Sequence, residues 1–557
     1  MFNSRLDPEQ RKNALEALSS KDFDVLVIGG GVTGVGTALD AASRGLRVAL
    51  IETNDIASGT SSRSSKLIHG GLRYLEQYDF KLVREALQER EALVTLLAPH
   101  LVKPVAFLYP LHEKIKDRTY VGAGLALYDV LRGFNRALPW HKHISQRSIA
   151  AISPSLRRDI VTGAIKYFDA QVDDARHTMM VARTAARHGA VITSGVRAES
   201  LIREGKRVVG VIATDNESGQ SIRISAGVTI MCAGVWSDQL HEQFSLKAGY
   251  EVRMSKGVHI VLPGSAINSQ SGIILKTPSS VLFVIPWNNQ WIVGTTDTEF
   301  VGNRDEPLAT REDVDYILNQ ANRVLQPMLK ESDIIGVYAG LRPLVSRKAD
   351  ESTSELSREH TVDRPAPGFV SIAGGKYTTY RIMARDVVDI ATRELKKSVP
   401  GSVTDKLPIV GADGYLALMQ QIPTLHADSG LSIQTIEHLL NRYGSLISEI
   451  LDLISEQPKL AKQLHPQFAY IEAEIYYAVS HEGARSVDDV ISRRTRLTFE
   501  AQENAEALIN AVADIISPVL GWGKKEKDRS IAEYKEIITR ERAACSLLLE
   551  KGTSVKS

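Results

Sequence analysis

Short apolar runs near the N-terminus are separated by polar and glycine-rich stretches in the order strand, turn, helix, strand. Residues 24–28 (DVLVI) form the first run, and Gly29-Gly30-Gly31-Val32-Thr33-Gly34 follows directly. A second run at residues 47–51 (RVALI) ends in Glu52. Because a strand, a glycine-rich turn and a helix occur in that order, the pattern predicts a βαβ unit.

The glycines and Glu52 are spaced as in a dinucleotide-binding turn. Gly29 permits the tight turn, Gly31 lets the backbone approach a diphosphate, and Gly34 lets the helix pack closely on the strand. The helix N-terminus favours the negative charge of the diphosphate. Glu52 follows about 20 residues on, where it accepts a hydrogen bond from a ribose 2′-hydroxyl, so the ligand is FAD or NAD rather than NADP.

The rest of the first two thirds of the chain has the alternation of an α/β fold. Short β-branched runs and helical stretches follow one another from residue 22 to residue 379. A helix is expected at 381–395. The candidate strands include residues 208–213, 228–232, 281–285, 291–295 and 369–373.

The pattern changes near residue 400. Two prolines and three glycines interrupt residues 398–415 (SVPGSVTDKLPIVGADGY), which predicts a linker. Residues 416–549 place apolar side chains three and four apart, which predicts a helical domain that caps or stabilises the catalytic part. We therefore divide the chain into an N-terminal extension (1–21), a catalytic part (22–395), a linker (396–415) and a helical domain (416–557).

Composition narrows the classes of function. With 557 residues the chain exceeds one simple core, and a net charge of +1 gives no support for nucleic-acid binding. Cys232 and Cys545 lie far apart, so neither a disulfide framework nor a CxxC pair is present, and a reduced, cytosolic setting is expected.

The sequence also limits how the chain meets a membrane. The first 21 residues carry charges of both signs and no apolar stretch of a secretory signal, and they predict a short exposed helix. No window approaches about 18 uninterrupted apolar residues, so any membrane contact is expected to be peripheral.

A single dinucleotide turn without a redox cysteine pair points to a flavoprotein that takes electrons from a small molecule. Residues 57–74 (ASGTSSRSSKLIHGGLRY) are rich in hydroxyl side chains and glycine, which suit close packing against the ribityl chain and diphosphate of a flavin. A surface loop is the alternative, and His69 lies either beside the flavin or as a partly buried, satisfied histidine. The candidate cofactor contacts here are Thr60, Ser61, Ser62, Ser65, Lys66 and His69.

A second candidate contact follows the run at residues 228–232. Ala233 and Gly234 come at the end of this predicted strand, where small residues let FAD pass close to the backbone. An ordinary strand-to-turn junction has the same pattern.

Three later segments each place a basic group at a junction between apolar residues and glycine. They are residues 256–259 (KGVH), 340–343 (GLRP) and 374–381 (GGKYTTYR). Each alone is compatible with a structural turn, but together they indicate an anion-binding pocket, because Arg offers a bidentate fork and Lys a point charge. The last segment opens a helix whose positive end suits negative charge on a reduced flavin, which adds Gly375 and Thr378 to the cofactor contacts.

These motifs resemble the FAD-dependent glycerol-3-phosphate dehydrogenases of the respiratory type. The resemblance covers residues 22–381 in the family's order and includes EGARSVDDVISRRTRL at residues 482–497. It implies an α/β fold in which a Rossmann-like FAD-binding domain is interleaved with a mixed-sheet substrate domain, followed by an α-helical domain. The matching segments are GGGVTGVG, TSSRSSKLIHGGLRYLE, VDDAR, AGVWSD, KGVHIVLP, FVIPW, GTTDTE, GLRPL and GGKYTTYR.

The resemblance implies oxidation of sn-glycerol 3-phosphate to dihydroxyacetone phosphate, with the C2 hydride passing to flavin N5 and the electrons to a quinone. The family's substrate pocket matches Arg73, Tyr74, His259, Arg342 and Lys376. Three of these, His259, Arg342 and Lys376, are the expected catalytic residues. His259 suits a base near neutral pH, whereas Arg342 keeps its proton and stabilises anion and alkoxide. No metal site is expected.

Several alternatives remain at this point. Glycerol-3-phosphate oxidases share the motifs but carry an insertion that this chain lacks, and amine oxidases of the glycine or sarcosine oxidase type act on carboxylates. An FAD-binding regulator that works through its helical domain is a third reading. Quinone use implies a cytoplasmic protein at the inner face of the cell membrane, and the oligomeric state, with a homo-oligomer as one outcome, stays open.

Overall fold

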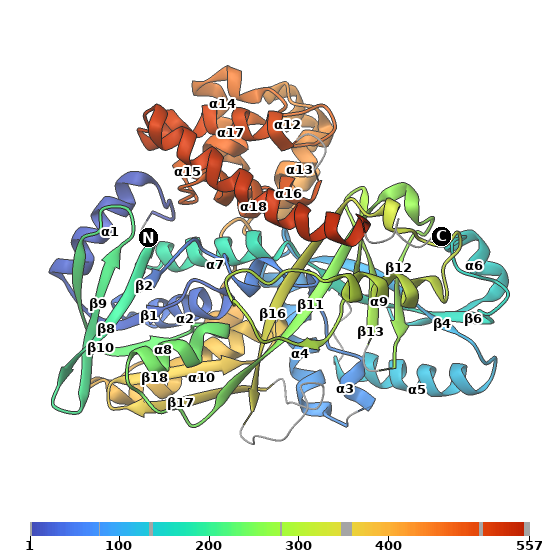
Figure 1. The fold of residues 1–557 in the computed structure, drawn as a ribbon, viewed down its shortest axis with the longest axis horizontal. Helices are drawn as coiled ribbons and strands as arrows, with labels where there is room; N and C mark the ends of the chain where they lie inside the picture. Colours follow the sequence, from blue (N-terminus) through green and yellow to red (C-terminus); the bar gives the residue numbers. More distant parts are fainter. Residues whose placement is uncertain are drawn as a thin grey trace.

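In the computed structural model, two β-sheets lie side by side beneath a layer of helices (Figure 1). The structure describes residues 3–76, 78–132, 137–278, 281–346, 359–500 and 505–550. Within these ranges the side chains of residues 73, 76, 499, 505, 506, 542 and 544–550 are not described.

The first sheet contains the predicted dinucleotide unit. Its parallel core is continuously buried, as expected for strands covered on both faces. Two further strands, β8 (Val196–Glu204) and β9 (Arg207–Asp215), extend the first half of β10 as an antiparallel ribbon. The order across the sheet is β17 (His360–Ala366), β18 (Phe369–Gly374), β10 (Ser221–Met231), β1 (Asp22–Ile28), β2 (Val48–Glu52) and β7 (Val191–Ser194).

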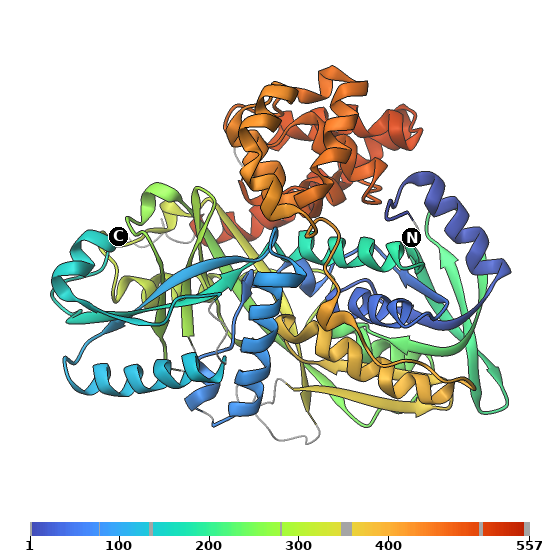
Figure 2. The ribbon, with the colours of Figure 1, turned by 180° about the vertical axis from the view of Figure 1, so that it is seen from behind.

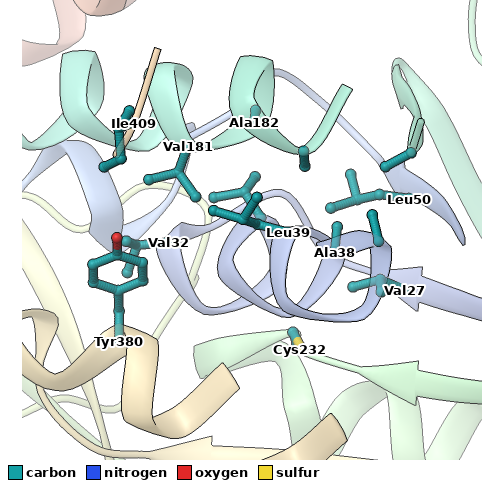
Figure 3. Close-up of a cluster of buried hydrophobic side chains, with 14 of the residues drawn as sticks. Val27, Val32, Ala38, Leu39, Leu50, Val181, Ala182, Cys232, Tyr380 and Ile409 are labelled. Atoms are coloured by element: carbon teal, nitrogen blue, oxygen red, sulfur yellow. The ribbon is translucent and has the colours of Figure 1, made fainter. Parts of the chain in front are cut away.

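One helix of this unit is enclosed between two others. The enclosed helix is α2 (Val32–Ser43), which packs between α7 (Asp174–Arg187) and α10 (Tyr380–Ala391). Figure 3 shows Leu39 of α2 packed toward Val181 of α7. On the other side, a Cβ at Gly36 would come within 2.9 Å of the ring of Tyr380. This packing fixes the N-terminus of α2 at the end of β1.

The second sheet is mixed, because β4 and β12 pair in parallel while its other pairs are antiparallel. β16 (Gly336–Ser346) pairs with β11 and β5 (Lys142–Ser145) pairs with β6. The order across it is β15 (Thr298–Glu299), β11 (Glu251–Pro263), β14 (Gln290–Gly294), β13 (Val281–Trp287), β12 (Gly272–Lys276), β4 (Lys103–Leu111), β6 (Gly163–Gln171) and β3 (Leu67–Ile68).

Helices cover both faces of the second sheet. α6 (Gln146–Ile152) and α9 (Arg311–Asn322) pack on one face, where Ile317 joins the buried side chains of β11 and β13. The opposite face carries α3 (Arg73–Glu76), α4 (Phe80–Ala92) and α5 (Lys116–Leu131). In Figure 2, α5 lies along the lower edge and α4 runs upward from it. The chain crosses between the sheets repeatedly, which confirms the predicted α/β fold with interleaved parts.

The chain after residue 415 forms helices, as the spacing of its apolar residues predicted. Two buried clusters hold them together. The last helix leaves this layer and contacts α9 and β16 of the second sheet (red in Figure 1). The helices are α11 (Tyr415–Gln420), α12 (Ile422–Ser429), α13 (Ile433–Tyr443), α14 (Ile447–Glu456), α15 (Glu472–Ser480), α16 (Leu497–Glu500), α17 (Ala505–Leu520) and α18 (Lys524–Glu550).

The predicted elements occur with small shifts at their ends. Strands β9, β10, β13, β14 and β18 lie at the five candidate positions, and the helix expected at 381–395 is α10, followed by a 3₁₀ turn at Thr392–Glu394. Residues 398–415 contain the 3₁₀ turn Thr404–Lys406, yet Ile409 and Val410 are buried. The domain boundaries stay a prediction.

The N-terminal helix differs from the expectation in one respect. α1 (Pro8–Ser20) forms where a short helix was predicted, but its inner face is not exposed. Leu18 and Ala14 are buried, and the helix packs against β7 and β10. Glu9, Lys12 and Glu16 are exposed, whereas Arg11 pairs with Asp215, so the exposure inferred from charge applies to one face alone.

Candidate active site

A cavity of about 750 Å³ lies at the carboxyl ends of β1, β2 and β10 and reaches β11 and β16 of the second sheet. This volume is in the range of cofactor and substrate pockets. Sixteen of the residues proposed from the sequence line it: Gly29, Gly30, Gly31, Glu52, Thr60, Ser61, Ser65, His69, Tyr74, Ala233, Gly234, His259, Arg342, Gly375, Lys376 and Thr378.

The glycine-rich turn has the geometry that the sequence predicted. Gly29 has a φ of +113°, and a Cβ there would come within 2.5 Å of the Cys232 carbonyl oxygen. A Cβ at Gly34 would come within 1.9 Å of the Gly29 carbonyl oxygen. Gly34 therefore acts through close helix packing and does not itself line the cavity.

Glu52 lies at the end of β2, facing the turn. Its Oε2 accepts a hydrogen bond from Gly30 N at 2.6 Å and its Oε1 one from Asn54 N at 2.8 Å. Burial raises the pKa of Glu52, while these two backbone N–H groups lower it. The carboxylate is thus held at the cavity wall, in the position expected for a ribose contact.

The residues around this turn fit an FAD. The N-cap of α2 is Gly31, which supplies no side-chain capping bond, so the helix N-terminus faces the cavity as an anion site. A Cβ at Gly31 would approach Ser61 Oγ to 3.3 Å, and Ser61 Oγ accepts from Val32 N at 2.9 Å. A glycine backbone and hydroxyl side chains thus form the part of the wall where a diphosphate would lie.

Two of the predicted cofactor contacts lie behind this wall instead of in it. Ser62 and Lys66 are buried and do not line the cavity. The Lys66 ammonium donates to the Ser62 carbonyl oxygen at 3.1 Å and to Asp174 Oδ1 at 2.9 Å. A buried carboxylate from α7 thus holds the lysine side chain behind the wall, and a flavin contact by these two residues stays a prediction.

His69 lies at the cavity, next to the start of α10. Its backbone N donates to Thr378 Oγ1 at 3.2 Å, and its ring meets Phe283 edge-on with centroids 5.9 Å apart. Of the two alternatives for His69, the structure places it among the residues that line the cavity.

His259 projects from β11 and is 2% exposed. Its Nε2 lies 2.8 Å from Ser65 Oγ, and its ring stacks on Tyr338 with centroids 4.7 Å apart. Burial, followed by the charges of Arg342 and Lys66, holds the pKa of His259 well below its ordinary value. The imidazole is therefore neutral near pH 7 and has a nitrogen able to accept a proton.

Arg342 on β16 is held by the segment after β14. Its Nη2 donates to Thr295 Oγ1 at 2.9 Å, and its Nη1 donates to Asp297 Oδ1 at 3.3 Å. A guanidinium keeps its proton in proteins, so a positive charge faces this end of the cavity.

Lys376 lies in the turn between β18 and α10. Its Nζ is 3.5 Å from the centroid of the Tyr74 ring, in a cation–π contact. Tyr74 belongs to α3, and the side chain of its neighbour Arg73 lies outside the described residues. The cavity thus brings Tyr74, His259, Arg342 and Lys376 together from four distant parts of the chain.

Some lining residues were missed by the sequence reasoning. Arg63, Ser64 and Trp236 lie within motifs that were recognised, so their signal was present but not used. Trp236 Nε1 donates to Asp305 Oδ1 at 2.8 Å, which ties the loop carrying Arg304 to the cavity mouth. No motif around Arg304 in the sequence indicated that this residue lines the cavity. Among the described residues no group of three or more His, Cys, Asp or Glu side chains is placed to hold a metal ion.

Two protein-family models match the chain. Residues 24–381 match the family described as FAD dependent oxidoreductase. Residues 402–527 match the family described as the C-terminal domain of alpha-glycerophosphate oxidase.

Individual relatives match over nearly the whole chain. A glycerol-3-phosphate dehydrogenase of Mycobacterium leprae is 48% identical over 97% of this chain and 92% of its own length. The mitochondrial glycerol-3-phosphate dehydrogenase of Homo sapiens is 34% identical over 96% of this chain and 76% of its own length. The structure of the glycerol-3-phosphate dehydrogenase from Bacillus halodurans complexed with FAD is similar with a TM-score of 0.78 at 29% identity, covering 97% of this chain and 98% of that one.

Proposed function

The chain belongs to the FAD-dependent glycerol-3-phosphate dehydrogenases, and from that membership we propose that it oxidises sn-glycerol 3-phosphate to dihydroxyacetone phosphate and passes the electrons to a quinone. The observation that carries this proposal is one cavity that joins the dinucleotide turn to His259, Arg342 and Lys376. A single cavity thus has both a cofactor end and a cationic end.

The cationic end suits a phosphomonoester. A phosphate dianion is held best by more than one cation, and Arg342 and Lys376 supply two that line the cavity. We assign Arg73 to the same task from its motif. Tyr74 contributes its ring face, which holds the Lys376 ammonium in place.

His259 is the proposed base. A bound flavin supplies the acceptor for the hydride that leaves substrate C2. His259 takes up a proton at Nε2 through Ser65, because Nδ1 is buried and Ser65 Oγ lies 2.8 Å from Nε2. Ser65, a residue of the cavity wall, passes its hydroxyl proton to Nε2 and receives the C2 hydroxyl proton of the substrate in its place. Arg342 stabilises the alkoxide as that proton leaves.

Anaerobic titration of the purified, FAD-loaded protein with sn-glycerol 3-phosphate tests the proposal. We expect the oxidised flavin absorbance to bleach with saturable dependence on substrate. Bleaching by glycine or sarcosine and not by glycerol 3-phosphate would support an amine oxidase. No bleaching by any phosphorylated polyol would favour a non-catalytic FAD-binding protein.

Oxygen is the second candidate acceptor. Residues 402–527 match a domain named after alpha-glycerophosphate oxidase, and this match favours oxygen as the alternative acceptor. Reoxidation of the reduced protein by oxygen and by a soluble quinone analogue separates the two. Fast reoxidation by oxygen with release of hydrogen peroxide would replace the quinone in the proposal.

A peripheral contact with the cytoplasmic face of the membrane completes the proposal. Tyr120, Leu127 and Val130 form an exposed apolar stripe along α5, at helical spacing. Trp140 is also exposed and lies beside Arg132 at the end of this helix. An exposed apolar helix face suits the interfacial region of a bilayer. Within the described ranges, no helix is both long enough and apolar enough to cross a membrane.

A further inference from the structure

Three arginines of one short segment are buried where the helical layer meets the first sheet. Arg493, Arg494 and Arg496 stand at the end of the π-helical turn Asp489–Arg494 and are 9%, 2% and 1% exposed. Such residues are buried in proteins chiefly when they are paired. Each is paired here with acidic side chains that come from the first 174 residues of the chain.

The first two arginines share one partner. Arg493 Nε donates to Asp55 Oδ2 at 2.6 Å, and Arg494 Nη2 donates to Asp55 Oδ1 at 2.7 Å. Asp55 follows β2 and does not line the large cavity. This pair of contacts therefore joins the helical layer to the segment after β2, and not to residues 60–68.

Arg496 reaches a different place. Its Nε and Nη2 donate to Asp173 Oδ1 at 2.9 and 2.7 Å, and Nη2 also contacts Asp174 Oδ1. Its Nη1 lies 3.4 Å from the Ser62 carbonyl oxygen. One guanidinium thus connects the N-terminus of α7 with the Ser-rich segment that forms the cavity wall.

Asp174 continues the connection to the cavity. Its Oδ2 accepts from Ser64 N at 2.9 Å and from Ser64 Oγ at 2.7 Å, while its Oδ1 accepts from Lys66 Nζ at 2.9 Å. The residue between Ser64 and Lys66 is Ser65, whose Oγ lies 2.8 Å from His259 Nε2. Both neighbours of Ser65 are therefore held by the carboxylate that Arg496 contacts.

Tyr338 supports the same arrangement from the second sheet. Its hydroxyl donates to the Ser64 carbonyl oxygen at 3.0 Å, and its ring stacks on His259. Ser64 is thus fixed through its N–H, its hydroxyl and its carbonyl group. Its side-chain and N–H contacts both depend on the orientation of Asp174.

We propose that Arg496 is a positioning residue of the reaction: through Asp174 it holds residues 64–66 so that Ser65 orients the His259 imidazole toward the substrate. The proposal rests on the function proposed above. It makes the helical layer part of the catalytic apparatus, although Arg496 does not line the cavity.

The cations around Asp174 show why the neighbouring Lys66 cannot replace the contacts that Arg496 makes with Asp173 and Asp174. Without Arg496, the buried Asp174 and the half-buried Asp173 stay adjacent, with Lys66 and Arg442 as the neighbouring cations. Lys66 already bonds to Asp174 and to the Ser62 carbonyl oxygen. A planar guanidinium bridges two carboxylates and a carbonyl oxygen, whereas an ammonium is a point charge.

Arg493 provides a matched control for the test. It belongs to the same segment, is also buried and also pairs with acidic groups, but its contacts lead to Asp55 and not to the Ser-rich segment. We compare Arg496→Gln and Arg496→Lys with Arg493→Gln in the full-length, FAD-loaded protein.

The first measurement is hydrogen exchange of a peptide spanning residues 60–68. Because Ser64 N and Lys66 N donate to side chains of this network, we expect exchange in Arg496→Gln to be at least about tenfold faster, and in Arg493→Gln to be unchanged. Equal protection in Arg496→Gln and the unsubstituted chain would overturn the proposal. This measurement needs no substrate, so it stands even where glycerol 3-phosphate fails to reduce the flavin.

The second measurement is single-turnover flavin reduction as a function of pH. We expect Arg496→Gln to be about tenfold or more slower at saturating substrate, with a displaced pH profile, a little-changed substrate dissociation constant and partial rescue by added guanidinium. Arg493→Gln should keep the rate within about twofold. Equal slowing in both variants, or slowing that only follows loss of FAD, would reduce Arg496 to a structural residue.

A double-mutant cycle covers the case in which Arg496→Gln does not fold. Arg496→Lys keeps the charge, and Ser65→Ala removes the link to His259. If both act on one path, their effects on the reduction rate are less than additive. Strict additivity would contradict the proposal.

Discussion

The Lys376 ammonium lies 3.5 Å from the centroid of the Tyr74 ring. The two residues are about 300 positions apart in the chain, and they meet at the wall of the cavity, which both side chains line. The ring holds a buried positive charge without neutralising it, as a carboxylate would. The Lys376 ammonium thus lies at the cavity wall, where an anionic substrate can approach it.

Replacing Lys376 by Met should weaken substrate binding selectively. The change removes the charge but keeps an unbranched side chain, so we expect KM for sn-glycerol 3-phosphate to rise by about 10- to 100-fold, the value of one charge-assisted hydrogen bond. FAD content, read from the absorbance spectrum, should stay unchanged. Tyr74→Phe is the matched control, because it keeps the ring face, and a comparable rise in KM there would contradict this account.

His259→Asn tests the base. The amide keeps a polar group near Ser65 but cannot take up a proton near neutral pH. We expect anaerobic flavin reduction in stopped flow to slow by about 10²- to 10⁴-fold while FAD stays bound. A rate within a few-fold of the unsubstituted protein would assign proton removal to another group.

Two Gly→Ala substitutions distinguish a glycine that is required by close packing from a glycine that only lowers helix stability. Gly34→Ala places a Cβ 1.9 Å from the Gly29 carbonyl oxygen, so we expect a large loss of stability and of FAD. Gly124→Ala in α5 meets nothing within 4 Å and should stabilise the protein by about 0.5–1 kcal/mol. Thermal unfolding with and without added FAD measures both, and similar midpoints for the two variants would contradict the close contact at Gly34.

Local patterns predicted those parts of the fold that neighbouring residues control. The turn at Gly29–Gly34, Glu52 and the strands that became β10, β13 and β18 depend on glycine spacing and short apolar runs. The ion pair of Lys66 with Asp174 could not be predicted, because 108 residues separate the two and no local pattern reveals which carboxylate a lysine meets. The buried face of α1 was missed for the same reason, since β7 and β10 cover it.

Among the residues of the cavity, too, local motifs could be predicted from the sequence and long-range contacts could not. Most glycines and hydroxyl residues proposed as cofactor contacts line it, because their motifs are compact. Arg496 and Asp174 could not be linked from the sequence, since their contact spans 322 residues. Long-range ion pairs depend on how the finished layers pack, and that packing is a property of the whole chain.

His177 predicts how stability depends on pH. It lies between Tyr377 and Tyr380, and burial lowers its pKa to about 4, although Asp174 and Asp173 act in the opposite direction. The unfolded chain, with a histidine pKa near 6.5, binds a proton that the folded chain does not. The free energy of unfolding should therefore fall as the pH drops from about 6.5 toward 4, by about 1.4 kcal/mol per pH unit for this group.

His177→Gln removes that proton uptake. Urea unfolding at pH 6.5 and at pH 5 measures how much the free energy of unfolding falls between the two pH values. We expect this fall to be about 2 kcal/mol smaller in His177→Gln than in the unsubstituted protein. Some dependence remains, because burial also lowers the pKa of His100 and of His481 to about 3. An unchanged pH dependence in His177→Gln would show that this histidine is not the group responsible.

The exposed stripe on α5 predicts where the protein meets lipid. Replacing Tyr120 and Val130 together by Ser removes two large apolar side chains that are 63% and 61% exposed. We expect cosedimentation with anionic lipid vesicles to fall by about tenfold, with flavin reduction unchanged. Val301→Ser is the control, since Val301 is 93% exposed and follows β15, at the edge of the second sheet opposite β6, the strand that α5 contacts. Equal vesicle binding by both variants would remove α5 from the contact.

The contacts of Arg494 with Asp55 bridge 439 positions, so a nascent chain carries Asp55 long before its partner exists. At about 5–20 residues per second, roughly 20–90 s of synthesis separate the two. During that time the acidic residues beside the dinucleotide turn and at the start of α7 have none of their arginine partners from residues 493–496. The ion pairs that join the helical layer to Asp55, Asp173 and Asp174 therefore form only after residues 493–496 have been synthesised, well after the described strands of both sheets.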